Sequence, residues 1–203
     1  MEGSADVDIF EVMETCRAIR YLRPDPVSEE LIEKLIWAGT RAPSPGNSQG
    51  YGFIVVRDKA NLAAIGDAVY AVMSEAISTV PSGNVANDPI AAGSLALAAS
   101  IRNLPALIVV AGKPVYPPSN PDERHVWSAL YPATQNLLLA ARALGLGATL
   151  TTYHHLAGPM IREVLAIPDE VRIGAVVPIG WPDRPFGPVS RRPVEDFIHR
   201  EAW

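Results

Sequence analysis

The segment from Ser128 to Leu144 limits how this chain can fold more than any other part of the sequence. It has the length of a helix, and its second half is a nearly unbroken run of leucine and alanine from Leu137 to Ala143. A helix that is apolar nearly all round has no wide polar face to turn toward water. We therefore expect this helix to be buried, either in the core of a domain or between two subunits.

Three apolar segments of strand length accompany this helix, at residues 51–56, 106–110 and 172–179. Their continuous apolar character is typical of strands buried in a sheet. Helical segments separate them, and Ser28 and the pair Asp88–Pro89 are strong helix start signals. The sequence also predicts helices at 8–16, 28–39, 61–73 and 158–165, a break at 82–84, a surface loop at 113–122, a short strand at 149–152 and a short helical piece at the end of the tail.

The overall composition is that of one globular domain covering residues 1–203. The chain is 48% hydrophobic and 19% charged, and it contains no repeat and no Gly/Ser-rich linker. Its length is sufficient to bury a core. The net charge of −5 argues against a nucleic-acid groove as the main function. Any anion that this protein binds must therefore be held by a local cluster of positive charge.

The N-terminal residues and the single cysteine, Cys16, predict a cytoplasmic protein. One thiol cannot form an internal disulfide, and no Cys/His cluster has the spacing of metal ligands. Residues 1–6 are acidic and lack the apolar core of a signal peptide. Between Pro89 and Gly112 the only charge is Arg102, and we expect a buried helix running into a buried strand there rather than a membrane span.

Two short sequence motifs, one on either side of a predicted helix, are the strongest indication of a binding site. Arg17 and Arg20 are three residues apart at a helix end and can lie on one side of a turn. Residues 42–49 form a loop of small residues, prolines and amides, which leaves several backbone N–H groups without helix or sheet partners. The hydrogen-bonding side chains of that loop include Ser44, Asn47 and Gln49.

Together the two motifs suit a ligand with a phosphate at one end and a planar polar heterocycle at the other. A flavin nucleotide is a ligand of this kind. Arg191 and Arg192 form a second basic pair, which could converge on the same phosphate. Two ordinary readings stay open at this point. Exposed arginines commonly pair with solvent or carboxylates, and a loop between a helix and a strand can be a plain turn.

Other candidate motifs favour structural roles. Gly145 and Gly147 follow a helix and precede a strand, which is the reverse of a dinucleotide-binding turn. His154 and His155 are adjacent and cannot share a helix face as a metal-binding pair would, so we interpret them as a surface or capping pair. We expect three tryptophans to be packing residues rather than a stacking platform, namely Trp37, Trp127 and Trp181.

These motifs and two others resemble those of the nitroreductase family of FMN-dependent oxidoreductases. The matching motifs are RAIRYLRPDPV at 17–27, RAPSPGNSQ at 41–49, QNLLLAARALGLG at 135–147 and GPVSRRPVE at 187–195. They occur in the family's order over nearly the whole chain. The resemblance implies an α+β fold with a central, mainly antiparallel sheet flanked by helices. It also implies an intertwined homodimer with two FMN sites at the interface, each built from both subunits.

The resemblance further implies where FMN binds. A basic residue such as Arg20 approaches the N1/O2 edge of the flavin ring, and arginines such as Arg17 hold the phosphate. The strand near Thr151 lies against the isoalloxazine, where a backbone N–H can reach N5. The positions that match the family's cofactor site are Arg17, Ala18, Arg20, Ser44, Asn47, Gln49, Leu150, Thr151, Thr152, Arg191 and Arg192.

The activity implied by the resemblance is a ping-pong reaction. NAD(P)H gives a hydride to N5 of FMN and leaves, and a nitroaromatic, a quinone or a related acceptor then takes its place. The cofactor carries the chemistry, so no side chain is expected to be catalytic. Two alternatives remain: a specialised flavin enzyme of the same fold, such as a dehalogenase or a flavin-cleaving enzyme, and a non-catalytic flavin carrier.

Three positions depart from the common family pattern. Cys16 stands where many members have a basic residue, and Ala18 stands where many have serine. The set of residues that binds the phosphate can therefore differ from the common one. Gly50–Tyr51 replaces the Pro-Trp that often follows the loop glutamine. Segments 74–90 and 114–121 lie where members vary in the cover over the substrate, so the identity of the acceptor does not transfer.

Overall fold

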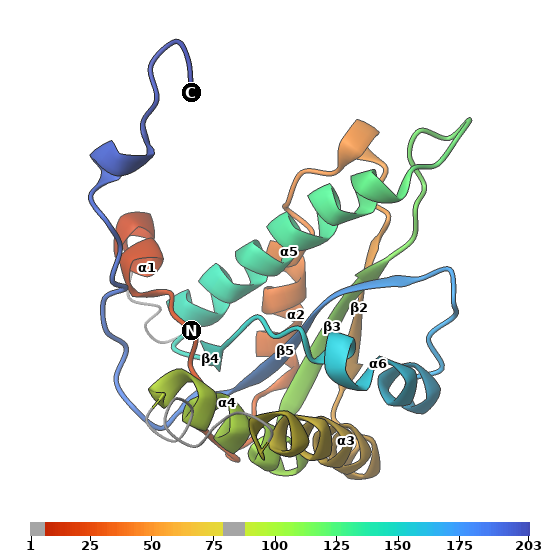
Figure 1. The fold of residues 1–203 in the computed structure, drawn as a ribbon, viewed down its shortest axis with the longest axis vertical. Helices are drawn as coiled ribbons and strands as arrows, with labels where there is room; N and C mark the ends of the chain where they lie inside the picture. The colour runs from red at the N-terminus through yellow and green to blue at the C-terminus, as the bar shows by residue number, and fades with distance from the viewer. Residues whose placement is uncertain (1–6, 79–87) are drawn as a thin grey trace.

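Two strands, β3 (Ala106–Gly112) and β5 (Arg172–Pro182), lie side by side in the middle of the molecule (Figure 1). The computed structural model describes residues 7–78 and 88–203. In this part of the chain β2 (Tyr51–Val56) extends the sheet beyond β3, while β1 (Leu22–Arg23) and β4 (Gly147–Ala148) pair with β5. Every described strand pair is antiparallel, which confirms the predicted type of sheet.

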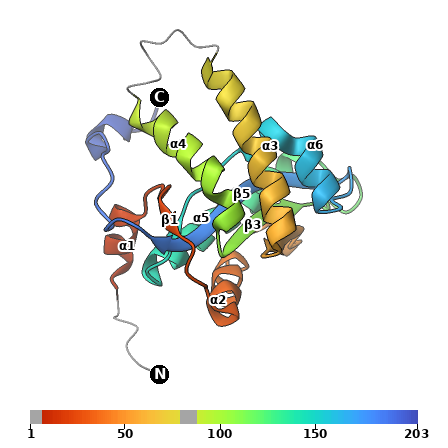
Figure 2. The ribbon, with the colours of Figure 1, turned by 90° about the horizontal axis from the view of Figure 1, so that it is seen from below.

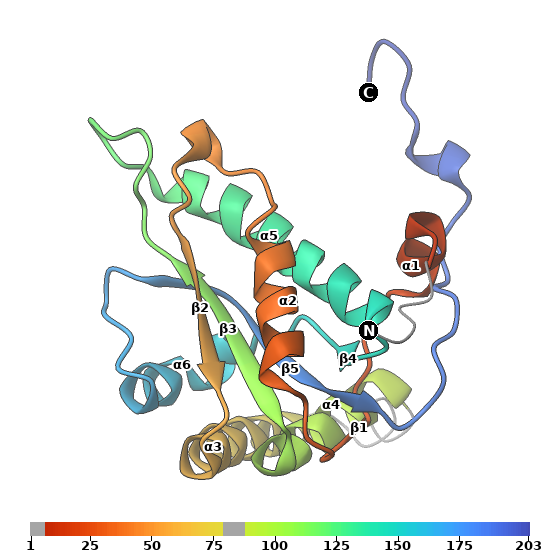
Figure 3. The same cartoon turned by 180° about the vertical axis from the view of Figure 1, so that it is seen from behind.

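Helices cover both faces of this sheet. Neighbouring residues of a strand point to opposite sides, so Leu107 and Val109 contribute to one core while Ile108 and Val110 contribute to the other. Because β3 is buried throughout, each face needs its own apolar cover. The covering helices are α3 (Lys59–Ser78), α4 (Pro89–Ser100) and α6 (Tyr153–Val164) on one face and α2 (Glu29–Gly39) and α5 (Glu123–Ala143) on the other (Figures 2 and 3).

Helix α5 is longer than the predicted 128–144 helix and is covered on one side only. Asp122 caps it, because its Oδ1 accepts a hydrogen bond of 2.8 Å from the Arg124 N–H. Leu130 and Leu137 are fully buried against the sheet and α2. Ser128, Tyr131 and Gln135 lie on the opposite, exposed face. A single chain therefore does not bury this helix on all sides, and its open face is the part that a second subunit would have to cover.

The helix start signals and the central strands follow the predictions closely. Ser28 Oγ accepts a hydrogen bond of 3.3 Å from the Leu31 N–H, and Asp88 Oδ1 accepts one of 2.8 Å from the Ile90 N–H, which confirms both N-caps. The predicted strands at 51–56, 106–110 and 172–179 are confirmed, although the last two run further. The surface loop at 113–122 and a short helical piece in the tail, η3 (Val194–Phe197), are also confirmed.

Other boundaries differ from the predictions. The strand predicted at 149–152 is wrong, because β4 ends at Ala148 and only Thr151 makes a further bridge to β5. Helices α3 and α6 begin before residues 61 and 158, respectively. The predicted break at 82–84 lies outside the described residues. No helix that the structure describes combines the length and the apolar character needed to cross a membrane.

The three tryptophans do not share one environment. Trp127 and Trp181 pack against the core on the α2 face, and the Trp181 indole N–H donates a hydrogen bond of 3.0 Å to the Pro26 carbonyl oxygen. These two confirm the predicted packing role. Trp37 is 63% exposed on α2, where the Arg41 guanidinium lies 5.3 Å from its ring centre. The packing role predicted for Trp37 is therefore wrong within one chain.

Helix α1 (Ile9–Thr15) and the first part of the C-terminal tail lie beside each other, away from the sheet (Figure 1). Helix α1 buries only Val12, and its apolar residues Ile9 and Met13 are open to solvent. The tail that follows β5 passes α1, where the Val189 N–H donates a hydrogen bond of 2.8 Å to the Glu14 carbonyl oxygen. Beyond this contact the tail extends away from the body with its large apolar side chains exposed, including Val194, Phe197 and Trp203.

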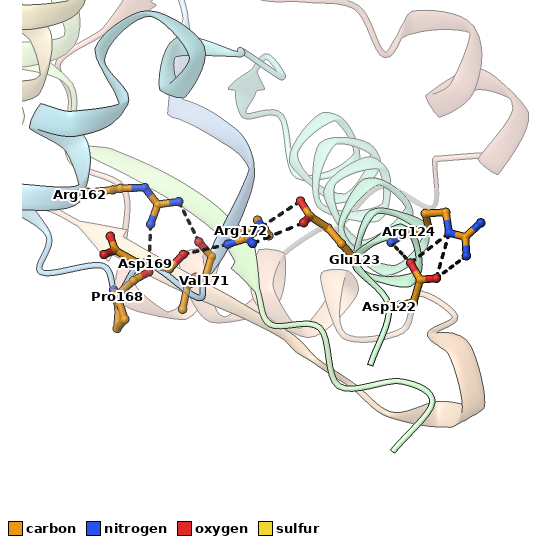
Figure 4. A network of polar contacts seen from close by, with 8 residues as sticks. All are labelled: Asp122, Glu123, Arg124, Arg162, Pro168, Asp169, Val171 and Arg172. Atoms are coloured by element: carbon orange, nitrogen blue, oxygen red, sulfur yellow. Dashed lines mark hydrogen bonds and ion pairs between the residues drawn. The ribbon is translucent and has the colours of Figure 1, made fainter. Parts of the chain in front are cut away.

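A polar network fixes the opposite end of the molecule, where α5 begins and β5 starts (Figure 4). Arg172 Nε lies 2.9 Å from Glu123 Oε1, and Arg172 Nη1 donates a hydrogen bond of 2.8 Å to the Asp169 carbonyl oxygen. Arg162 of α6 donates hydrogen bonds to the carbonyl oxygens of Pro168 and Val171. Each exposed ion pair contributes little by itself, but together these contacts hold α5, α6 and β5 in one arrangement.

Candidate functional site

The segment from Arg17 to Arg20 is an extended stretch at the edge of the sheet. The expectation that both arginines lie on one helical turn is wrong, because α1 ends at Thr15. The Ile19 N–H donates a hydrogen bond of 3.1 Å to the Ala148 carbonyl oxygen, which fastens the segment to β4. Ile19 is buried, whereas Arg17 and Ala18 are exposed and Arg20 is half-buried. The segment therefore presents its charges at two neighbouring cavities.

The first cavity, of about 190 Å³, opens between this segment and the C-terminal half of α5, and we call it the α5 cavity. Arg17 and Ala18 line one wall. Side chains of α5 line another, and the stretch that follows β4 completes it. The residues that matter for its chemistry are Cys16, Arg17, Gln135, Arg142, Thr149 and Leu150.

The stretch beyond β4 presents free backbone N–H groups. Its ladder with β5 is interrupted at Thr149, because the opposite residue, Pro178, has no N–H to donate to the Thr149 carbonyl oxygen. The ladder resumes at Thr151, which exchanges two hydrogen bonds of 3.1 Å with Val176. Within residues 7–78 and 88–203, the N–H groups of Thr149 and Leu150 have no hydrogen-bond partner, although Thr149 is only 4% exposed. Buried N–H groups are nearly always paired, so this stretch fits a ligand that carries acceptor atoms.

The second cavity, of about 360 Å³, opens between the same segment and α4, and we call it the α4 cavity. Arg17, Arg20 and Arg184 line it, and none of its described lining residues is acidic. The Arg184 guanidinium lies 4.2 Å from the ring centre of Tyr21. A Cβ at Gly93 would lie 3.3 Å from Arg20 Cδ, so the glycine leaves room for the arginine. The cavity is positively charged in an acidic protein.

Arg142 is a site residue that sequence reasoning missed. Its side chain is 14% exposed and lines the α5 cavity with Arg17. Burial raises the pKa of the neighbouring Cys16 thiol above its ordinary value, and the positive charge of Arg142 opposes that shift in part. The thiol is therefore neutral near pH 7. One signal could have found this residue, because Arg142 is the only charge in the apolar run from Leu137 to Leu144.

The loop at residues 42–49 lies at the other end of α5. It contains the short helix η1 (Pro45–Asn47), and Ser44 Oγ closes it by accepting a hydrogen bond of 3.0 Å from the Gln49 N–H. Asn47 and Gln49 have positive φ angles of 51° and 49°, which a compact loop requires. Ser48 lies in a small cavity with Ala129 near the start of α5, whereas Arg17 shares a cavity with Arg142 near its end.

The loop and the arginine segment therefore do not meet within one chain. The thirteen steps along the helix from Ala129 to Arg142 correspond to roughly 20 Å of its axis. Arg191 and Arg192 lie in the exposed tail, where Arg191 donates to the Ser190 carbonyl oxygen and Arg192 stacks on Phe197 at 4.4 Å. No contact in the described part of the chain joins either residue to Arg17.

The start of α6 continues the stretch that carries the free N–H groups. The Thr152 carbonyl oxygen accepts a hydrogen bond of 2.8 Å from the His155 N–H, which makes Thr152 part of the first turn. Burial raises the pKa of Tyr153 to about 12, and its hydroxyl donates to the Ser94 carbonyl oxygen at 3.4 Å. The rings of His154 and His155 lie 4.2 Å apart. Tyr153 thus connects this end of the site to α4.

Comparison with known proteins agrees with this architecture. The model of the nitroreductase family matches residues 14–181. A relative from Archaeoglobus fulgidus, which carries the provisional name NADH dehydrogenase/NAD(P)H nitroreductase, is 32% identical over 97% of this chain and 99% of its own. The chain belongs to the nitroreductase family. The sequence resemblance is confirmed, and the nitroreductase-like fold is confirmed with it.

Two solved structures share the nitroreductase fold. A nitroreductase from Desulfitobacterium hafniense with bound FMN superposes with a TM-score of 0.72 at 20% identity, covering 99% of this chain and all of that one. An iodotyrosine deiodinase bound to FMN and 3-iodo-L-tyrosine superposes with a TM-score of 0.77 at 18% identity, covering 97% and 100% of the two chains. At identities this low, the superpositions establish the common fold alone. The activity has to be inferred from the residues of the site.

The half-buried His154 predicts a pH dependence of stability. Burial, together with the positive charges of His155 and Arg162, lowers its pKa from 6.5 to about 4, and its Nδ1 has no hydrogen-bond partner among the described residues. Between these two values the unfolded chain binds a proton at this side chain and the folded chain does not. We therefore expect the free energy of unfolding to fall as the pH is lowered from 6.5 to 4.

Urea unfolding across this pH range checks the prediction. His154→Gln should make the dependence shallower, whereas His199→Gln, a change in the exposed tail, should leave it as it is. Equal slopes for the unmodified protein and His154→Gln would contradict it.

Proposed function

We propose that this protein is an FMN-dependent oxidoreductase that takes a hydride from NAD(P)H and reduces a nitroaromatic, a quinone or a related small acceptor. One observation carries the proposal. Arg17 lines the α5 cavity together with Thr149 and Leu150, whose N–H groups are unpaired, and Arg20 lines the neighbouring α4 cavity. The names of the A. fulgidus relative and of the FMN-bound D. hafniense nitroreductase support the same function.

The residues present fit FMN by their chemistry. Guanidinium groups are suited to phosphate oxygens and to a negatively charged ring edge, and backbone N–H groups are suited to the ring's acceptor atoms. Arg17 would hold the phosphate, joined by Arg191 or Arg192 from the tail. Arg20 would face the N1/O2 edge of the ring. The stretch containing Leu150, Thr151 and Thr152 would lie against the ring, with a backbone N–H near N5.

The contribution of the chain is binding, orientation and electrostatics. When bound, FMN supplies two-electron chemistry by accepting and returning a hydride at N5. Arg20 would stabilise negative charge on the ring of a bound flavin, since a cation in a half-buried site interacts more strongly with a charge than one in open water. The apolar side chains around the α5 cavity, such as Leu138 and Leu146, exclude water from its walls.

We propose further that the site is completed by a second copy of the chain in a homodimer. The loop residues Ser44, Asn47 and Gln49 lie too far along α5 to reach Arg17 of the same chain. Large apolar side chains are exposed on α1 and on the tail, a pattern typical of surfaces that another protein covers. The loop at 42–49 and the segment from Arg17 to Arg20 are thus two half-sites, and the open face of α5, which includes Tyr131, runs between them. A partner's loop placed across this face would supply the missing contacts.

The proposed activity predicts a coloured protein that reacts with a nicotinamide. We expect the purified chain to bind FMN with yellow absorbance, and NADH or NADPH to bleach that absorbance under anaerobic conditions. Addition of a nitroaromatic or a quinone should then restore it. A protein that takes up no FMN would contradict the cofactor assignment, and a yellow protein that neither nicotinamide bleaches would be a flavin carrier instead.

The role of Arg20 predicts a defect in both binding and reduction. Arg20→Ala should weaken FMN binding by about 10- to 100-fold, the range for losing a hydrogen bond to a charged group, and should slow flavin reduction. Flavin titration and stopped-flow absorbance measure the two effects. Arg23→Ala is a suitable control, because Arg23 is half-exposed and pairs with Asp25 at 3.4 Å outside both cavities. Unchanged affinity and reduction rate in Arg20→Ala would remove this residue from the site.

The shared site predicts complementation between two defective chains. One chain carries Arg17→Ala and Arg20→Ala, and the other carries Ser44→Ala, Asn47→Ala and Gln49→Ala. Each homodimer should lose FMN, whereas the mixed dimer regains one intact site, because the second chain supplies the arginines and the first supplies the loop. The flavin content of co-expressed, doubly tagged dimers measures this. Mixed dimers that hold no more FMN than either homodimer would show that each site lies within one chain.

A further inference from the structure

Arg142 is fixed in place more firmly than a surface arginine. Its Nε donates a hydrogen bond of 2.7 Å to Thr15 Oγ1, whose own hydroxyl donates to the Glu11 carbonyl oxygen at 2.7 Å. The ring centre of Phe186 lies 4.4 Å from its guanidinium carbon. With the side chain 14% exposed, these contacts set both the position and the plane of the guanidinium. A guanidinium held in this way loses little conformational freedom when it binds an anion.

The contacts of Arg142 leave part of its hydrogen-bonding capacity unused. A guanidinium has five N–H donors. Nε is taken by Thr15, and Nη2 makes a long contact of 3.3 Å with Glu11, whose side chain is 58% exposed. In residues 7–78 and 88–203, Nη1 has no hydrogen-bond partner. The wall of the α5 cavity thus contains a positioned cation with free donors.

The charge balance of the α5 cavity favours an anion. Arg17 and Arg142 both line it, and none of its described lining residues is a carboxylate, the ion pair of Arg142 with the exposed Glu11 lying outside this lining. Cys16 lines the same cavity in a neutral form, since burial raises the pKa of its thiol. Gln135 and the N–H of Thr149 add uncharged donors to the same cavity. Two cations and several neutral donors around a small cavity are the arrangement that binds a phosphomonoester.

We infer that Arg142 binds the phosphate of FMN together with Arg17, so that a cation from α5 supplies part of the phosphate grip. This inference rests on the proposed flavin function. It differs from a purely structural role, in which Arg142 only ties α5 to α1 through Thr15 and Glu11. A phosphate-binding arginine discriminates between flavins with and without a phosphate. A structural arginine affects both flavins alike.

Flavin titrations of the full-length protein separate the two roles. Quenching of flavin fluorescence gives the Kd for FMN and for riboflavin, which has the same ring and ribityl chain but no phosphate. Arg142→Gln should weaken FMN binding by about 10- to 100-fold, as expected for the loss of a hydrogen bond to a charged group, and should leave the affinity for riboflavin unchanged. Arg124→Gln is the matched control, because Arg124 lies in the first turn of the same helix with its side chain 89% exposed.

The remaining outcomes are decisive as well. Equal losses for FMN and riboflavin, or no loss for either, would overturn the inference while the proposed function stands. A parent protein that binds neither flavin would instead overturn the proposed function. If Arg142→Gln does not fold, Arg142→Lys keeps the charge but not the fork of donors. It should then retain only part of the preference for FMN, and a preference equal to that of the parent protein would refute the role of Arg142.

Discussion

The burial of β3 and β5 on both faces is the constraint on which the rest of the structure depends. A strand whose residues are all apolar needs cover on two sides, and here α3, α4 and α6 supply one layer while α2 and α5 supply the other. Beside β5 the ladder is interrupted at Thr149, which lies opposite Pro178. The unpaired N–H groups of Thr149 and Leu150 and the side chain of Arg17 lie together at that edge.

Features set by a few neighbouring residues could be predicted from the sequence. Ser28 and Asp88 cap their helices through contacts within three residues, and the run from Ala106 to Val110 is typical of a buried strand. Features set by distant residues could not. β4 stops at Ala148 because the residue opposite the next position is a proline about thirty positions later in the chain. Trp37 is exposed because none of the residues that the structure describes packs over that side of α2 closely enough to bury it.

The residues of the candidate site also fall into some that the sequence predicts and others that it does not. The arginine motif and the loop motif can be recognised in the sequence because each is a compact run of unusual composition. Both occur in the order in which the nitroreductase family has them. Their separation along α5 could not be read from spacing, since only the folded helix sets that distance. Arg142 was overlooked because a single charge in an apolar helix resembles a solvent-facing position. Its side chain is in fact turned into a cavity and covered by Phe186.

One physical reason connects the incomplete site with the exposed apolar surface. α5 is buried on one face and open on the other, and the two half-sites lie at opposite ends of that open face. Exposed apolar side chains cost free energy in water unless they are covered, and here they are Tyr131 on this face and the side chains of α1 and the tail beyond one end of it. Covering the open face with a second, oppositely placed copy would bring the loop of one chain toward the arginines of the other. The same burial that stabilises such an assembly would therefore also build its binding sites.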